Sequence, residues 1–133
     1  MIAASTPGQT SVTGRILLLD DDPVLRQITA ALLAEAGHPV REAEDAGMAL
    51  ELLKQEPGFD LAMVDFSLPD MTGDEFAQAA RDRDPDLRVL FMTGYAVPAQ
   101  LEAERWCIQK PFRRDELLAL VGEALEVPSP RMA

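Results

Sequence analysis

The feature that most constrains this chain is a run of four apolar residues, 61–64, that ends on a single carboxylate, Asp65. An apolar run without alternation is typical of a strand that is buried on both faces, as in a parallel sheet. The residues after it include Pro69 and Gly73, which are common in turns. Asp65 is therefore predicted to lie where a buried strand leaves its sheet, and open α/β sheets bind their ligands there.

Short apolar runs and segments of helical periodicity alternate along the rest of the chain. The apolar runs predict strands at 15–19, 39–42, 61–65, 87–92 and 106–109, of which the second is weak. Apolar residues spaced three or four apart predict helices at 23 to about 37, 46–54, 72 or 73 to 83 and 113–126, and a shorter one at 98–104. The side chains expected to face the core from these helices are Leu25, Ile28, Leu32, Leu50, Leu53, Phe76, Ala79, Ala80, Leu117, Val121 and Leu125.

This alternation of strands and helices with short links predicts an α/β fold with right-handed crossovers. Five such units predict a doubly wound, five-stranded parallel sheet of the flavodoxin type, with strand order 2-1-3-4-5. The first and third strands are then neighbours, and their carboxyl ends lie side by side. Residues 1–14 and 127–133 show no periodicity and are expected to be a flexible N-terminal tail and a short C-terminal tail, which leaves 15–126 as one domain.

The composition argues against several classes of protein. The chain has 133 residues, which suits one domain, and a net charge of −11 with a sequence pI of about 4.4. Such an acidic chain would be repelled by the phosphates of duplex DNA. Its single cysteine excludes an internal disulfide, and no apolar run reaches the ~18 residues of a membrane span. Because the start also lacks a secretory signal, we expect a cytoplasmic protein without nucleic-acid or membrane partners.

Polar residues that suit phosphoryl chemistry follow four of the five predicted strands. The first strand is followed by Asp20 and Asp21, the third ends on Asp65, and the fourth and fifth lead into Thr93 and Lys110. Three carboxylates at one sheet edge repel one another unless a cation joins them, and oxygen ligands favour Mg²⁺ (or Mn²⁺). A metal ion, an ammonium and a hydroxyl together stabilise a transferring phosphoryl group, which a carboxylate can accept as an acyl phosphate.

These motifs in this order resemble the receiver domain of two-component response regulators, the CheY-like family, over about residues 15–126. The matching segments are the acidic cluster at 18–22, the acceptor motif at 64–73, the pair Thr93 and Gly94, and 110–112. The resemblance implies the CheY-like fold and a phosphoacceptor function in two-component signal transduction and phosphorelays.

The resemblance also assigns roles around the metal. It implies that Asp65 is the residue phosphorylated to an aspartyl phosphate. Asp21 would bind Mg²⁺ directly, Asp20 would act through water, and Ser67 would contribute its backbone carbonyl, with Asp65 completing the set.

Further roles concern the phosphoryl group. The resemblance implies that Thr93 and Lys110 bind it, and that Thr93 moves on activation. Pro111 matches a proline that commonly follows a cis peptide bond, which is rare enough to be worth checking.

The resemblance further implies a histidine kinase or histidine phosphotransferase as the phosphodonor, and self-dephosphorylation rather than enzymatic turnover. Because few residues follow the last predicted helix, we expect the output to be a change in binding to an unidentified downstream protein. The protein is expected to be a monomer or a weak dimer.

Two departures from the family concern how phosphorylation is transmitted: the residue at the usual aromatic position, and a segment between Thr93 and Lys110 that looks shorter than the family norm. Many receivers carry an aromatic residue three positions before the lysine, whereas this chain has Cys107 there, with Trp106 beside it. The segment from Phe91 to Tyr95 partly resembles the Phe-Ala-Thr-Gly-x-Tyr signature of the single-domain FAT GUY response regulators, but Met92 replaces the alanine. Tyr95, Trp106 and Cys107 are therefore the candidate coupling residues.

Two alternative functions remain open. The segment Asp20-Asp21-Asp22 also fits the signature of haloacid-dehalogenase-type phosphatases, in which Asp20 would be the nucleophile and Asp22 the general acid. Against this, Asp22 followed by Pro23 is typical of a helix N-cap. The other alternative is a receiver-like scaffold that is never phosphorylated. His38, the single histidine, is expected on the surface rather than in a phosphotransfer role.

Overall fold

The structure, a computed structural model, describes residues 12–94 and 97–126. Residues 1–11 and 127–133, which make up most of the two predicted tails, lie outside the described residues, as does the candidate coupling residue Tyr95. None of the helices in the described part of the chain is long and apolar enough to cross a membrane.

Five parallel strands form one sheet in the predicted order, β2-β1-β3-β4-β5. They are β1 (Ile16–Leu19), β2 (Val40–Ala43), β3 (Leu61–Asp65), β4 (Arg88–Thr93) and β5 (Cys107–Gln109). Leu19 at the end of β1 pairs with Val64 of β3, and Asp65 pairs with Met92 of β4. The carboxyl ends of β1, β3 and β4 therefore meet at one edge of the sheet, where a doubly wound fold binds its ligand.

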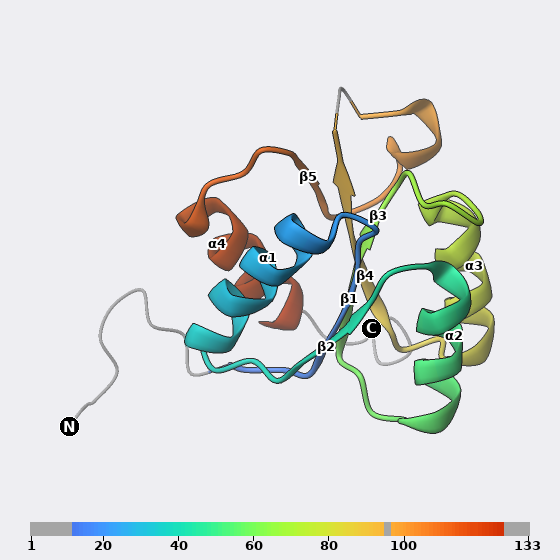
Figure 1. Ribbon diagram of the computed structural model, residues 1–133, viewed down its shortest axis with the longest axis horizontal. Coiled ribbons are helices and arrows are strands. Elements are labelled where there is room, and N and C mark those ends of the chain that lie inside the picture. Colours follow the sequence, from blue (N-terminus) through green and yellow to red (C-terminus); the bar gives the residue numbers. More distant parts are fainter. Residues whose placement is uncertain (1–11, 95–96, 127–133) are drawn as a thin grey trace.

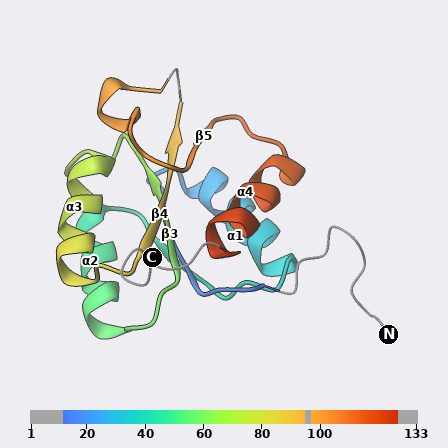
Figure 2. The same cartoon turned by 180° about the vertical axis from the view of Figure 1, so that it is seen from behind.

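Helices cover both faces of the sheet (Figures 1 and 2). The helices α1 (Pro23–Glu35) and α4 (Arg114–Glu126) lie on one face, and α2 (Ala46–Gln55) and α3 (Gly73–Arg83) lie on the other. The segment predicted as a short helix at 98–104 forms only a 3₁₀ turn, η1 (Ala99–Leu101). Leu101 is the one buried residue of η1. Starting a helix is costly, and a single buried side chain provides too little packing to stabilise further turns.

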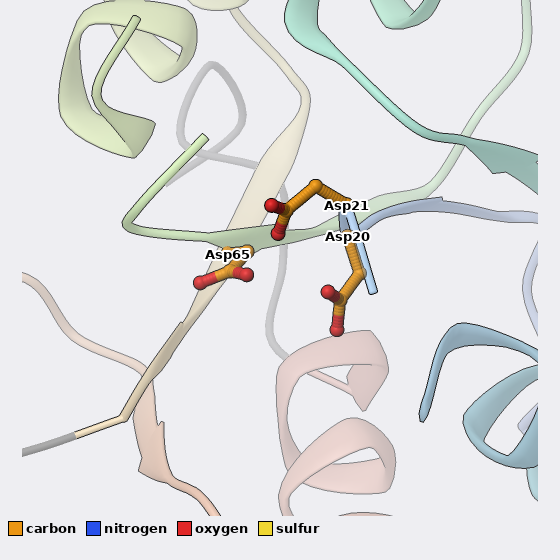
Figure 3. Close-up of side chains that lie close together, drawn as sticks. All are labelled: Asp20, Asp21 and Asp65. Carbon is orange, nitrogen blue, oxygen red and sulfur yellow. The ribbon is translucent and has the colours of Figure 1, made fainter. Parts of the chain in front are cut away.

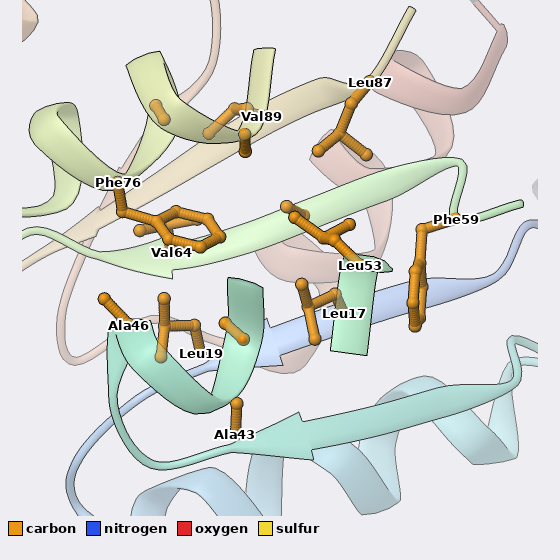
Figure 4. Packing of buried hydrophobic residues seen from close by; sticks show 14 of the residues in the cluster. Leu17, Leu19, Ala43, Ala46, Leu53, Phe59, Val64, Phe76, Leu87 and Val89 are labelled. Carbon is orange, nitrogen blue, oxygen red and sulfur yellow. The ribbon is translucent and has the colours of Figure 1, made fainter. Parts of the chain in front are cut away.

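Two hydrophobic clusters, one on each side of the sheet, form the core. Successive residues of a strand point to opposite faces, so Leu17 and Leu19 join the cluster under α2 and α3, while Ile16 and Leu18 join the cluster under α1 and α4. Figure 4 shows the first cluster, which also contains Phe76 of α3. All five residues of β3 are buried, as its unbroken apolar run predicts.

The buried face of α1 differs from the prediction. Thr29 and Leu33 are its buried residues, whereas Leu25 and Leu32 are half-buried and Ile28 is 54% exposed. Each residue advances the helix by about 100°, so the line of contact with the sheet lies one residue beyond the predicted stripe. The predicted core position of Ile28 is therefore wrong.

Other expectations about burial also need correction. Leu50 and Ala79 are half-buried, while the remaining predicted core residues of α2, α3 and α4 are buried. His38, expected on the surface, is buried, and its Nδ1 accepts a hydrogen bond from the backbone N–H of Gly14 at 3.2 Å. Burial lowers the pKa of this imidazole because its charged form is poorly solvated there.

Candidate functional site

Three carboxylates gather at the ends of β1 and β3, as predicted (Figure 3). Each of Asp20, Asp21 and Asp65 has a carboxylate oxygen within 4.8 Å of the other two. Asp20 and Asp65 are buried, whereas Asp21 is exposed. The cluster is thus a partly open site of hard oxygen ligands, the donor set that suits Mg²⁺.

Lys110, which directly follows the edge strand β5, contacts two of these carboxylates. Its Nζ donates to Asp65 Oδ2 at 3.1 Å and to Asp20 Oδ2 at 3.2 Å. Its backbone N–H donates to the carbonyl of Thr93 at 2.7 Å, so the backbone of Lys110 is held beside the end of β4. The peptide bond between Lys110 and Pro111 is cis. Lys110 thereby spans from the edge of the sheet to its centre.

The charges of the site oppose one another. Burial raises the pKa of the Asp65 carboxyl to about 6, against the opposing effect of the Lys110 ammonium and with a further increase from the Asp20 carboxylate. For Lys110, burial lowers the pKa, but the carboxylates of Asp65 and Asp20 raise it more, so the net shift is upward. The lysine therefore stays a cation, while Asp65 is an anion that its surroundings stabilise poorly.

The backbone around Asp65 is closely packed. The N–H of Ser67 donates to Asp65 Oδ1 at 3.3 Å, and the N–H of Phe66 donates to the carbonyl of Met92 at 2.9 Å. A Cβ added at Gly73 would lie 2.8 Å from the carbonyl oxygen of Asp65 and 2.8 Å from the Cα of Phe66. Only glycine therefore allows the start of α3 to lie this close to the phosphoacceptor candidate.

Asp70, which lies between Pro69 and Gly73 in the predicted turn, connects the loop after β3 to α2. Its Oδ1 accepts from the N–H of Ala46 at 3.1 Å and its Oδ2 accepts from the N–H of Gly47 at 3.0 Å. Slight desolvation raises the pKa of this carboxyl, but these backbone hydrogen bonds lower it more, so the net shift is downward. Asp70 acts as a second cap of α2, beside Asp45, whose Oδ1 accepts from Met48 N at 2.8 Å.

Arg26 supports the acidic cluster from α1, and the sequence predicts neither this role nor that of Asp70. Its Nη1 donates to the backbone carbonyl of Asp20 at 2.7 Å, and its Nε donates to Glu42 Oε1 of β2 at 3.1 Å. The carbonyl of Asp20 is thereby held by a charged donor that is itself anchored to the neighbouring strand. An arginine on an otherwise ordinary helix gives no sequence signal for such a contact.

Asp22 has the role of a helix cap. Its Oδ1 accepts from the N–H groups of Val24 and Leu25 at 3.0 and 3.1 Å. This confirms the predicted N-cap and leaves the general acid of the phosphatase alternative bound to the helix terminus.

The remaining candidates lie on β4 and near β5. Thr93 is buried at the end of β4, and its hydroxyl is hydrogen-bonded to the thiol of Cys107. Trp106 is buried in the cluster under α1 and α4, and its Nε1 donates to Glu123 Oε2 of α4 at 3.1 Å. Of the two described coupling candidates, Cys107 contacts the phosphoryl-binding candidate Thr93, while Trp106 is hydrogen-bonded to α4.

Comparison with known families identifies this arrangement. The family model described as the response regulator receiver domain matches residues 16–122, most of the chain. The chain is a response regulator receiver domain. Receiver domains are signalling phosphoacceptors of two-component systems, and the phosphatase alternative finds no support in this match.

Individual relatives agree with the family match. The receiver domain is 35% identical over 116 residues to the response regulator receiver protein CpdR of Brucella abortus. The aligned region covers 84% of this chain and 96% of CpdR. Other curated relatives are longer: the receiver domain spans 25% of a transcriptional regulatory protein and 13% of a sensor protein.

Solved structures share the fold. A CheY-like receiver domain protein from Methanospirillum hungatei superposes with a TM-score of 0.79 and is 31% identical, covering 86% of this chain and 94% of that one. The response regulator TrrA of Thermotoga maritima, solved in complex with Mg²⁺ and beryllofluoride, has a TM-score of 0.76 and is 29% identical, covering 84% of this chain and 99% of that one.

Proposed function

We propose that this receiver domain accepts a phosphoryl group on Asp65 from the phosphohistidine of a histidine kinase or phosphotransferase, with Mg²⁺ (or Mn²⁺) bound. The observation that carries the proposal is the position of the Lys110 ammonium, 3.1 Å from Asp65 Oδ2 and within a cluster of three carboxylates. A buried carboxylate beside a fixed cation is placed to become an acyl phosphate whose charge that cation then stabilises.

The residues present fit a divalent cation. Asp20, Asp21 and Asp65 offer oxygen atoms within 4.8 Å of one another, and Lys110 supplies a single positive charge against three negative ones. Asp21, Asp65 and the backbone carbonyl of Ser67 would hold the ion, with Asp20 acting through water. A bound Mg²⁺ supplies charge neutralisation at the phosphoryl oxygens.

The protein's own groups carry the transfer. An Asp65 oxygen attacks phosphorus, the bond between phosphorus and the donor's imidazole nitrogen breaks, and that imidazole keeps the electron pair and takes up a proton. Lys110 and the hydroxyl of Thr93 bind the transferred oxygens. Water later attacks phosphorus, the bond between phosphorus and the Asp65 oxygen breaks, and inorganic phosphate leaves. The carboxylate is thereby restored and the signal ends. The form that is phosphorylated on Asp65 signals through a changed affinity for a downstream protein.

Intact mass spectrometry tests the proposal. Wild type and Asp65→Asn are incubated with acetyl phosphate in Mg²⁺ and, separately, in EDTA. We expect one phosphoryl group on wild type in Mg²⁺, and none on the variant or in EDTA. Borohydride reduction of the acyl phosphate followed by peptide mapping should place the modification at Asp65.

Two results would contradict the proposal. One is a phosphoryl group that maps to Asp20 and persists in Asp65→Asn, which would support the phosphatase alternative. The other is a wild-type protein that acquires no phosphoryl group and binds no beryllofluoride in Mg²⁺, which would support the unphosphorylated scaffold.

A further inference from the structure

The side chain of Thr93 points away from Asp65, whose phosphoryl group it is proposed to bind. Asp65 pairs with Met92, and Met92 points into the cluster under α1 and α4. Because successive strand residues point to opposite faces, Thr93 points to the other face, the side of α3 and η1. Its hydroxyl must therefore rotate to meet a phosphoryl oxygen on Asp65.

Cys107 is the partner of Thr93 on that face. It pairs with Phe91, two residues before Thr93 on β4, so the three side chains share one side of the sheet. The thiol of Cys107 is hydrogen-bonded to the Thr93 hydroxyl. Cys107 is only half-buried, so part of its surface is open to solvent.

Cys107 lies on the side of α3 and η1, whereas Asp65 lies on the other side of the sheet. The Thr93 hydroxyl therefore has to leave the thiol when it turns toward a phosphoryl oxygen on Asp65. We propose that Cys107 is a positioning residue that holds Thr93 in its resting orientation and competes with the phosphoryl group for its hydroxyl. This inference rests on the proposed function, since it concerns the same phosphoryl group. Each phosphorylation then exchanges one hydrogen bond at β5 for one at Asp65, and the exchange involves a cysteine that is partly exposed to solvent.

Beryllofluoride, which imitates the phosphoryl group on a carboxylate, tests the competition by its affinity in saturating Mg²⁺. Removing the thiol in Cys107→Ala should tighten beryllofluoride binding about fivefold, the ratio that one neutral hydrogen bond is worth. Cys107→Val should do the same, while Cys107→Ser, which keeps a hydrogen-bonding group, should stay within about twofold of wild type. A residue that only packed against β4 would give no change or weaker binding.

The Thr93→Val variant is the background in which the effect of Cys107→Ala on beryllofluoride affinity is measured again. In this variant the effect of Cys107→Ala should vanish, because no hydroxyl remains for the thiol to hold. Ile108→Val, which loosens the same strand on the opposite face, should not tighten binding. In methyl NMR spectra, the Thr93 methyl signal of unliganded Cys107→Ala should move toward its position in the wild-type beryllofluoride complex.

The outcomes separate this inference from the proposed function. If wild type binds beryllofluoride at Asp65 and Cys107→Ala binds it equally or more weakly, the competition is refuted and the proposed function stands. Tighter binding that persists in Thr93→Val would also refute it, because the effect would then not pass through the hydroxyl. If wild type binds no beryllofluoride, both proposals fail together.

Discussion

Replacing Asp65 by asparagine should stabilise the metal-free protein at neutral pH, although it removes the proposed phosphoacceptor. Asparagine has the shape of the protonated carboxyl and carries no charge at any pH. The raised pKa of Asp65 means that the folded protein holds this proton more tightly than the unfolded chain does. The carboxyl therefore contributes stability that is complete at low pH and is lost as the pH rises.

The size of the effect follows from the shift. The pKa of Asp65 rises from 3.8 to about 6 on folding. At 1.36 kcal/mol for each pKa unit, this corresponds to an upper figure of about 3 kcal/mol. The variant and wild type should be equally stable below about pH 4, and the variant should gain its full advantage above about pH 7.

Urea denaturation in EDTA at a series of pH values, followed by circular dichroism, measures this difference. Adding Mg²⁺ at 100 times its dissociation constant should stabilise wild type by about 2.7 kcal/mol and leave Asp65→Asn unchanged. Asp82→Asn, at an exposed site on α3, is the control and should show only a small, weakly pH-dependent change. A variant that is less stable than wild type at neutral pH, or an advantage that does not grow with pH, would refute the reasoning.

Further predictions concern the backbone near the site. Gly73→Ala should cost about 1–3 kcal/mol in urea denaturation and slow labelling by acetyl phosphate, because its Cβ would overlap the backbone of Asp65. Gly47→Ala, where the added Cβ meets atoms at ordinary distances of 3.5 Å or more, should instead preserve or raise stability. Asp70→Ala should cost about 1 kcal/mol at neutral pH through loss of a helix cap. Because the folded pKa of Asp70 is lowered, this cost should disappear as the pH falls through that lowered value, and a cost that persists in acid would contradict the capping role.

The parts of the fold that were predictable are those that a local run of residues determines. The strands β1, β3 and β4 are mostly apolar runs that end in or lead into a polar residue, so the centre of the sheet and the meeting of Asp20, Asp21 and Asp65 could be expected from the chain alone. The cap at Asp22 is equally local, since its partners are two and three residues away.

The features that escaped prediction depend on residues far apart in the sequence. Asp70 meets α2 through partners 24 and 23 residues away, and turn composition gives no indication of that contact. The phase of α1 depends on how the whole helix lies on the sheet, which is why Ile28 is exposed and Thr29 is buried. Likewise, Cys107 was recognised as a departure from the family, but its contact with Thr93 required the register of β4 and β5.

The geometry of Lys110 has a mechanical consequence. Its backbone is fastened to β4 beside the edge strand β5, while its ammonium is fastened to β3 and β1 in the middle of the sheet. The side chain of Lys110 therefore links the edge of the sheet to its centre through hydrogen bonds that can break. If a phosphoryl group on Asp65 draws the ammonium away from Asp20, the edge strand keeps its link to β3 but loses its link to β1. We expect amide hydrogen exchange in β5 to accelerate when that link is lost, so that a chemical event at one atom is observed as a change in the rigidity of a strand.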